Sequence, residues 1–351
     1  MAMINPDEIK NVSWHTVDEV GFRLTGFPWY SKEKKLNRLP TETKLEFREE
    51  LIQLGKYPTG GQIAFQSDSS FIYVKVKLAD VDQAETMPLT ATGGFDLYVG
   101  PPGKQTFYLA SRWGTEEVNY CCHLFEHDEK SIRNFVLNFP LKKEVLSFEV
   151  GLEKGCELLE PMPYDTDGKI VFYGTSITHG LCVARPGLIY PNKISRTLNK
   201  ELVNFGFNGN AKGDLSIATA LSGISDVSIF ILDYEANCTD ENYMDTIPPF
   251  IEKLRNVYPE TPILLLSRPP FSTEIHQSKA LNARMVMFEK QKEYINLNRQ
   301  SDPHLYFKGW HELLGPDFHE YTTDSVHPNS LGSVKMAEVL SPVIREILNL
   351  D

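Results

Sequence analysis

The hydrophobic positions of the chain follow a different pattern in each half. Up to about residue 160, short runs alternate apolar and polar residues, as in Phe71-Ile-Tyr-Val-Lys-Val-Lys-Leu78. A period of two is typical of antiparallel strands with one buried face. Gly and Pro turns separate the runs, so the first half is predicted to be a β-sandwich, jelly-roll-like in type. The other runs of this kind are 62–65, 95–99, 105–109, 134–138 and 145–150.

After about residue 165, short and continuously apolar runs alternate with helical patterns. The runs 170–173, 227–232 and 263–267 predict strands that are buried on both faces. Strands joined by crossover helices form a parallel sheet flanked by helices, so the second half is predicted to be of the α/β class. The helical patterns lie near 190–198, 247–257, 280–297 and 331–348.

The chain is long enough for two domains. At 351 residues, each half can bury a core of its own. The segment Glu160-Pro-Met-Pro-Tyr-Asp-Thr-Asp-Gly168 is rich in turn-forming residues and is predicted to join the halves. We therefore expect a boundary near residue 163, with domains at 1–163 and 164–351.

Charge and cysteine content narrow the classes of partner. The 35 basic and 47 acidic residues give a formal net charge of -12, which disfavours the phosphate neutralisation that nucleic-acid binding requires. Without a secretion-signal pattern or an apolar stretch of membrane-spanning length, we expect a cytoplasmic protein with no membrane partner. The cysteines are odd in number and lack a CxxC pair, so they are expected to be reduced thiols. They are Cys121, Cys122, Cys156, Cys182 and Cys238.

The loop after the first predicted strand of the second half carries a candidate nucleophile. It reads Tyr173-Gly-Thr-Ser-Ile-Thr-His-Gly180 and follows the carboxyl end of that strand, where open α/β sheets hold their ligands. Ser176 would stand at the start of a helix, where free amides favour developing negative charge. The alternative is that Ser176 only caps this helix, which is a common role for serine.

A serine nucleophile needs a base and a group that orients the base. The segment Thr323-Asp-Ser-Val-His-Pro-Asn-Ser-Leu-Gly332 offers Asp324 and His327 in a loop before the last helix. Alone, this segment could equally hold an aspartate cap and a surface histidine. Because both segments fall in one predicted domain, together they favour a Ser-His-Asp triad.

Four blocks in chain order resemble the SGNH (GDSL-type) hydrolases, in particular the branch whose β-rich N-terminal domain carries a Gly-x-Asp-Leu-Tyr motif and that includes bacterial carbohydrate acetyl esterases. The resemblance implies a three-layer α/β/α catalytic domain with a flavodoxin-like parallel sheet behind an N-terminal β-sandwich. The blocks are Gly94-Phe-Asp-Leu-Tyr98, Gly174-Thr-Ser-Ile-Thr178, Asn204-Phe-Gly-Phe-Asn-Gly-Asn210 and Asp324-Ser-Val-His327-Pro.

The resemblance also implies catalytic roles. Ser176 would be the nucleophile, with its amide as one oxyanion donor, His327 would be the general base, and Asp324 would orient that base. In the second block, Gly209 aligns best as an amide donor, with Gly206 as the second choice.

The third block departs from the family pattern. Where the family usually shows Gly-x-Asn-Asp, this chain reads Asp233-Tyr-Glu-Ala-Asn-Cys238, so Asn237 is the candidate side-chain donor to the oxyanion. Thr175 stands where the family's name motif has an aspartate, a position outside the triad.

Three further residues are candidates for substrate binding. His179 and Arg185 follow the nucleophile and could line the mouth of the pocket, although an ordinary ion pair would also explain Arg185. Trp310 precedes the Asp324 segment and could stack on a sugar, although a buried core position is the commoner outcome for tryptophan. His123-Leu-Phe-Glu-His127 fits a zinc-peptidase pattern, which its place among predicted strands disfavours.

These residues predict a serine carboxylesterase that removes small acyl groups, acetyl above all, from oligosaccharides such as those derived from hemicellulose. We expect no cofactor and no metal, and an N-terminal domain that contacts carbohydrate. The alternatives are an acyltransferase or an esterase acting on a small molecule other than a carbohydrate, and, in a different class, a non-catalytic carbohydrate-binding protein. Homo-oligomer formation is left open.

Overall fold

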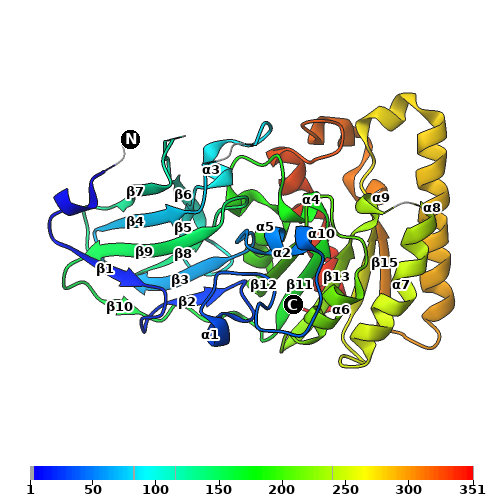
Figure 1. Cartoon of the computed structure of the whole chain (residues 1–351), viewed down its shortest axis with the longest axis horizontal. Helices are drawn as coiled ribbons and strands as arrows, with labels where there is room; N and C mark the ends of the chain where they lie inside the picture. The colour runs from blue at the N-terminus through cyan, green and yellow to red at the C-terminus, as the bar shows by residue number, and fades with distance from the viewer. Residues whose placement is uncertain (1–3, 82–83, 115, 239, 351) are drawn as a thin grey trace.

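Two antiparallel sheets form the N-terminal half of the computed structural model, which describes residues 4–81, 84–114, 116–238 and 240–350 (Figure 1). One sheet has the strand order β1-β9-β4-β7, and the other has the order β10-β3-β8-β5-β6 with β2 paired to β3. The strands are β1 (Val12–Thr16), β2 (Arg23–Thr25), β3 (Gln62–Ser67), β4 (Phe71–Leu78), β5 (Asp96–Val99), β6 (Thr106–Ala110), β7 (Asn119–Glu126), β8 (Arg133–Asn138), β9 (Val145–Glu153) and β10 (Leu158–Leu159). The short helices are η1 (Pro6–Glu8), α1 (Tyr30–Glu33), α2 (Glu49–Gly55) and α3 (Leu89–Thr92).

The two sheets share one apolar core, which confirms the predicted β-sandwich. Residues of β4 and β9 pack against residues of β3 and β8 within a single buried cluster. Aromatic rings join the layers, with Phe95 stacked on Phe148 at 4.5 Å between ring centroids. His123 lies in β7, opposite Tyr73, so the helical turn that the zinc-peptidase pattern requires is not formed there. A jelly-roll topology stays a prediction.

The C-terminal half is built on a five-stranded parallel sheet with the order β12-β11-β13-β14-β15. The last strand of the N-terminal half ends at Leu159 and the first strand of this sheet begins at Lys169. The strands are β11 (Lys169–Gly174), β12 (Glu201–Gly206), β13 (Val227–Asp233), β14 (Ile263–Ser267) and β15 (Leu305–Gly309). The helices are α4 (Ser176–His179), η2 (Pro186–Leu188), α5 (Tyr190–Leu198), α6 (Leu215–Ser222), η3 (Glu235–Asn237), α7 (Asp240–Arg255), η4 (Ser272–His276), α8 (Ser278–Asn298), α9 (Trp310–Leu314), η5 (Pro316–Tyr321) and α10 (Ser330–Ile347).

Helices cover both faces of this sheet, which confirms the predicted three-layer α/β/α arrangement (Figure 1). Val171 and Tyr173 of β11 face a core shared with α6, α7 and α8. Ile170 and Phe172 of the same strand face a second core shared with α5, α9 and α10. Alternate residues of each strand are therefore buried on opposite sides, as expected of a parallel sheet. Among the described residues, no helix combines the length and apolar character needed to span a membrane.

The Gly-x-Asp-Leu-Tyr motif lies at the junction of the two halves. Asp96 is fully buried, and its Oδ2 accepts from Arg185 Nη1 at 2.9 Å and from the Gly187 amide at 2.8 Å. Its Oδ1 accepts from Asn138 Nδ2 at 2.7 Å. Tyr98 completes the contact, because its hydroxyl accepts from Arg185 Nη1 at 2.6 Å. The motif thus connects the β-sandwich to the loop that follows α4.

Replacing this buried carboxylate should destabilise the protein. We expect Asp96→Ala to lower the free energy of unfolding by about 3 kcal/mol, because Arg185 would keep a largely buried charge without a partner. Urea denaturation followed by tryptophan fluorescence measures the loss. Asp18→Ala is the matched control, since Asp18 pairs with Lys34 on the surface and such pairs contribute about 0–1 kcal/mol. Equal losses in the two variants would contradict the role given to Asp96.

Candidate active site

Ser176 is the first residue of α4, and Thr175 alone separates it from the carboxyl end of β11. The alternative that Ser176 merely caps this helix is wrong. Thr175 is the capping residue, because its side chain accepts a hydrogen bond from the Ile177 amide at 3.3 Å. The Ser176 side chain is thereby left to face the loop that carries His327.

Ser176, His327 and Asp324 form a continuous hydrogen-bonded chain. Ser176 Oγ lies 2.8 Å from His327 Nε2, and His327 Nδ1 lies 2.7 Å from Asp324 Oδ2. Ser176 is 8% exposed, whereas the side chains of His327 and Asp324 are 21% and 37% exposed. The hydroxyl and the base are therefore within hydrogen-bonding distance, and the base is partly open to solvent.

The Asp324 carboxylate is held by the chain that follows it. Its Oδ1 accepts from the amides of Val326 and His327 at 3.0 and 2.8 Å. Partial burial acts to raise the pKa of Asp324, but these amides and the His327 ring outweigh it and bring the pKa below its ordinary value. Asn329, and not Asp324, caps α10, which removes the second alternative for this segment.

Ser325 positions the loop between Asp324 and His327, a role that the sequence analysis missed. Its backbone has φ of 81°, a left-handed conformation that few residues other than glycine adopt. Its carbonyl accepts from the Ser272 amide at 3.1 Å, and its hydroxyl accepts from the Thr273 amide at 3.2 Å. The loop after β14 therefore supports the catalytic loop, and only an unusual backbone angle would have pointed to Ser325.

The two candidate amide donors to the oxyanion differ in their surroundings, because Gly206 ends β12 and Gly209 lies in the loop that follows. The Gly206 amide already donates to Asn204 Oδ1 at 2.8 Å, so it is not available to a ligand. Gly209 is exposed, has φ of 65°, and a Cβ atom built there would meet no atom within 4 Å. Among the described residues, the Gly209 amide has no hydrogen-bond partner. It is thus available to a ligand.

Asn237 stands beside that loop, at the carboxyl end of β13. Its Oδ1 accepts from the Ala211 amide at 3.3 Å, so the Asn237 side chain contacts that loop. The loop of Gly209 is in turn joined to β11, because the Phe207 amide donates to the carbonyl of Gly174 at 2.9 Å. The loops that carry Ser176, Gly209 and Asn237 are therefore neighbours at one edge of the sheet.

Arginines of the N-terminal half hold the loop after β12. Arg48 donates from Nε and Nη2 to the Asp214 carboxylate at 2.7 and 3.0 Å, and from Nη1 to Asn210 Oδ1 at 2.9 Å. Arg38 is fully buried and donates from Nη1 to the Gly206 carbonyl at 2.8 Å. Burial lowers the pKa of Arg38 to about 9. The β-sandwich half therefore helps to position this part of the site.

Asp233 holds α4 in place through hydrogen bonds, a role that was not predicted from the sequence. It ends β13, is 4% exposed, and accepts from Tyr190 OH at 2.8 Å and from Thr178 Oγ1 at 3.4 Å. Burial raises the pKa of Asp233 to about 6, against the lowering effect of these hydrogen bonds. An acidic residue that ends an otherwise apolar strand is the sequence signal that could have revealed it.

Two predicted substrate-binding residues are buried, so those predictions are wrong. His179 is fully buried, with Nδ1 3.1 Å from the Gly206 carbonyl and Nε2 2.6 Å from the Leu141 carbonyl. Burial, together with the charge of Arg38, lowers the pKa of His179 to about 3. Trp310 is also fully buried and cannot stack on a sugar.

The third predicted substrate-binding residue, Arg185, is engaged in the junction described above. Its guanidinium pairs with Asp96 and lies 3.7 Å from the centre of the Phe107 ring. An ion pair was the alternative considered for Arg185, and the structure favours it over contact with substrate.

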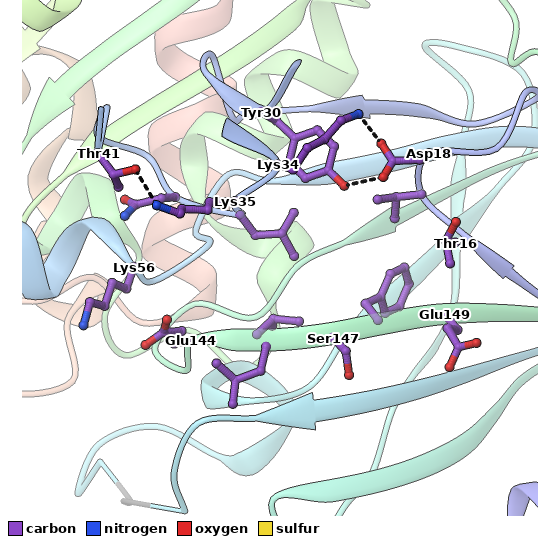
Figure 2. Close-up of a pocket in the computed structure, with 16 residues that line it drawn as sticks. Thr16, Asp18, Tyr30, Lys34, Lys35, Thr41, Lys56, Glu144, Ser147 and Glu149 are labelled. Atoms are coloured by element: carbon purple, nitrogen blue, oxygen red, sulfur yellow. Dashed lines mark hydrogen bonds and ion pairs between the residues drawn. The ribbon is translucent and has the colours of Figure 1, made fainter. Parts of the chain in front are cut away.

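A groove of about 700 Å³ lies in the N-terminal half, beside β9 and α1 (Figure 2). Lys34 Nζ and Tyr30 OH donate to Asp18 at 2.6 and 3.3 Å, and Lys35 Nζ donates to Thr41 Oγ1 at 2.9 Å. Its described lining contains no histidine, and none of the triad residues belongs to it. The groove has the size of a ligand site, but contact of this half with carbohydrate stays a prediction.

Two family models match the chain and together cover most of it. The model described as the GDSL-like lipase/acylhydrolase family matches residues 167–345, just over half of the chain. The chain belongs to this family. This acylhydrolase is therefore a carboxylic ester hydrolase. The model described as the N-terminus of SGNH-hydrolase-type esterases, with its GxDLY motif, matches residues 12–158, which confirms the resemblance seen in both halves.

Solved structures share the whole fold of the acylhydrolase. A protein of Bacteroides ovatus described as a GDSL-like lipase is 28% identical, with a TM-score of 0.88 over 97% of this chain and 99% of its own. A salicylyl-acyltransferase from a tetracycline biosynthetic pathway is 17% identical, with a TM-score of 0.74 over 98% and 99%. A family two carbohydrate esterase from Cellvibrio japonicus is 12% identical, with a TM-score of 0.62 over 96% and 98%. No curated protein sequence matches the chain.

Proposed function

We propose that the protein is a serine esterase that removes small acyl groups, acetyl above all, from O-acetylated oligosaccharides through an acyl-enzyme on Ser176. The observation that carries the proposal is the hydrogen-bonded chain from Ser176 Oγ through His327 to Asp324, with distances of 2.8 and 2.7 Å. A hydroxyl, an imidazole and a carboxylate in this order are the parts that nucleophilic acyl transfer requires.

In the first half of the reaction, Ser176 Oγ attacks the ester carbonyl carbon while His327 Nε2 takes the hydroxyl proton. Asp324 accepts a hydrogen bond from the Nδ1–H group of His327, which fixes the tautomer that has its lone pair on Nε2 and stabilises the imidazolium that forms. The amides of Ser176 and Gly209 and the Asn237 Nδ2 group would donate to the oxyanion. When the tetrahedral intermediate collapses, the bond between the carbonyl carbon and the sugar oxygen breaks, and His327 gives the proton to that oxygen, which leaves as a hydroxyl.

In the second half, water attacks the acyl-enzyme and His327 again serves as base. The proton passes from water to Nε2 and then to Ser176 Oγ as the acid leaves, so the enzyme returns to its starting state. The same oxyanion donors serve both steps, since the carbonyl oxygen stays in place. Neither half requires a redox step.

Similarities of fold and the exposure of the triad support a sugar as the alcohol portion of the substrate. The fold is shared with a family two carbohydrate esterase from Clostridium thermocellum in complex with cellohexaose and with an acetyl xylan esterase of Butyrivibrio proteoclasticus. The side chains of His327 and Asp324 are partly exposed, which leaves room for a leaving group larger than a simple alcohol. We infer that acetylated fragments of hemicellulose are suitable substrates, and a cytoplasmic location stays a prediction.

Incubation with a panel of acetylated mono- and oligosaccharides tests this proposal, with NMR identifying the position that loses its acetate. We expect release of acetate from at least one sugar at a rate above that of acetylated amino alcohols. Turnover of 4-nitrophenyl acetate without activity on any sugar would refute the substrate class and leave the esterase chemistry intact.

Acyl transfer to a hydroxyl acceptor is the second candidate function. The observation that favours it is the similarity in fold to a salicylyl-acyltransferase along the full length of both chains. An acyl-enzyme can be intercepted by an alcohol in place of water, so product analysis separates the two reactions. A yield of transferred ester that exceeds free acid, in water with a modest acceptor concentration, would favour transfer.

Asn237→Ala should reveal whether the side chain acts on the transition state. We expect kcat to fall by about 10²- to 10³-fold with a much smaller change in KM, because an oxyanion donor acts when the charge develops. Steady-state kinetics on 4-nitrophenyl acetate provides the measurement. Asn199→Ala, at the end of α5, is a control that should retain activity. A change in KM alone would show that Asn237 binds the ground state.

A further inference from the structure

Cys182 is a buried thiol that borders the triad and has no part in the proposed reaction. It is 7% exposed, and its backbone adopts the left-handed conformation, with φ of 68°. Its Sγ lies 3.2 Å from Oγ1 of Thr86, an exposed residue of the N-terminal half. The thiol therefore sits just beneath the surface, where the two halves meet beside the catalytic loop.

Cys182, Asp324 and His327 each offer one atom that could bind a metal ion, and these three atoms lie close together. A sulfur, a carboxylate oxygen and an imidazole nitrogen, one from each residue, all lie within 4.8 Å of one another. Zinc binds such atoms at about 2.0–2.3 Å, so side-chain rotations that move the ligand atoms inward by about 1 Å would close the site around an ion. The Asp324 side chain is 37% exposed, which gives a hydrated cation access from solvent.

We propose that Cys182, Asp324 and His327 form an inhibitory site for a thiophilic divalent cation, Zn²⁺ above all. The inference rests on the proposed function, since it regulates the same histidine that acts as base. The donor set selects the cation. A thiolate with an imidazole suits Zn²⁺ and Cd²⁺, whereas Mg²⁺ and Ca²⁺ prefer sites made only of oxygen.

Binding of the cation would disable the base whichever ring nitrogen it uses. A neutral imidazole has one lone-pair nitrogen and one N–H. If the cation occupies Nε2, it takes the place of the Ser176 hydroxyl. If it occupies Nδ1, the remaining proton must reside on Nε2, which then cannot accept the proton of Ser176. The sulfur lone pair forms the bond to the metal, and the thiol proton leaves to solvent.

The test uses the purified full-length chain after treatment with EDTA. Turnover of 4-nitrophenyl acetate is measured against rising ZnCl₂, and each variant is compared with its own metal-free rate. We expect Zn²⁺ to inhibit the wild-type enzyme, EDTA to restore it, and MgCl₂ to have no effect at the same concentrations. Cys182→Ser should raise the Zn²⁺ concentration for half-inhibition by about tenfold or more, since it removes one ligand.

A second variant and a matched control complete the kinetic test. Cys182→Gly removes the thiol with a residue that accepts the left-handed backbone, so it remains informative if the serine variant does not fold. Cys156→Ser removes a half-buried thiol that contacts Ser67 in the sandwich, and it should keep the wild-type response to Zn²⁺. Equal inhibition of the wild type and a folded Cys182 variant, or no inhibition of the wild type, would overturn the proposal.

A direct binding measurement separates this proposal from the esterase proposal. Cd²⁺ bound to a thiolate gives an ultraviolet charge-transfer band, which we expect in the wild type, in Cys156→Ser and in the inactive Ser176→Ala variant. The band should be lost in Cys182→Ser and weakened in His327→Ala. If the protein has no esterase activity but shows this pattern, only the proposed function fails. If the band is unchanged without Cys182, the metal site is refuted.

Discussion

We expect Ser176→Ala to lower kcat for 4-nitrophenyl acetate by about 10⁴- to 10⁶-fold while the protein stays folded. Alanine removes the hydroxyl oxygen on which the proposed acyl-enzyme forms, and the 2.8 Å contact to His327 Nε2 disappears with it. The backbone of α4 should be unaffected, because Thr175 caps the helix and Asp233 accepts from Thr178. Purified protein and a sensitive assay are needed, since a trace of wild-type enzyme would hide the loss.

Ser228→Ala provides the matched control for that measurement. Ser228 lies near the amino end of β13, at the opposite edge of the sheet from the proposed site, and its hydroxyl donates to the Asp167 carbonyl at 3.2 Å. We expect the Ser228→Ala variant to be as active as the wild type. Turnover by Ser176→Ala at more than a small fraction of that rate, with normal circular dichroism, would show that another residue is the nucleophile.

Asp324→Asn is expected to lower kcat by about 10⁴-fold, although the side chain keeps its size. The asparagine oxygen can still accept from the amides of Val326 and His327, so the loop should keep its shape. Its NH₂ group would then face His327 Nδ1 and require a lone pair there. The ring proton moves to Nε2, and the base can no longer accept from Ser176.

The pH dependence of the wild type gives an independent check on Asp324. Because the hydrogen bonds of its loop bring the pKa of Asp324 below the ordinary value of 3.8, its carboxylate stays charged through mildly acidic pH. The acidic limb of kcat/KM should therefore contain no proton uptake by Asp324 and should have unit slope. A steeper limb would indicate a second group. Asp226→Asn, an exposed position at the start of β13, should show the wild-type profile and rate.

Local sequence patterns were sufficient to predict the strands that are apolar and buried along nearly their whole length. The strands at β11, β13 and β14 are continuous apolar runs and were predicted within a few residues. β12 was missed because Asn204 interrupts its apolar run, yet Asn204 is fully buried and its side chain donates to the Thr178 carbonyl at 2.8 Å. β15 was missed because it is an edge strand whose exposed Lys308 breaks the pattern.

The triad loops could be predicted because each carries its chemistry within a few residues. The substrate-binding residues could not, because nearness to Ser176 along the chain does not fix the direction of a side chain. His179 follows the nucleophile by one helical turn but points to a carbonyl 38 residues away, that of Leu141. Contacts of this kind depend on how the two halves pack, and no local pattern describes that packing.

The contact between Asp96 and Arg185 has a consequence for the evolution of this protein. The two residues stand 89 positions apart, yet the carboxylate is fully buried and takes its charge partner from the other half. A mutation that neutralises one of them alone would leave the charge of the other at the junction without a partner. We therefore expect the two positions to change together among descendants of this chain, so that variation in the sandwich and in the acylhydrolase half is not independent.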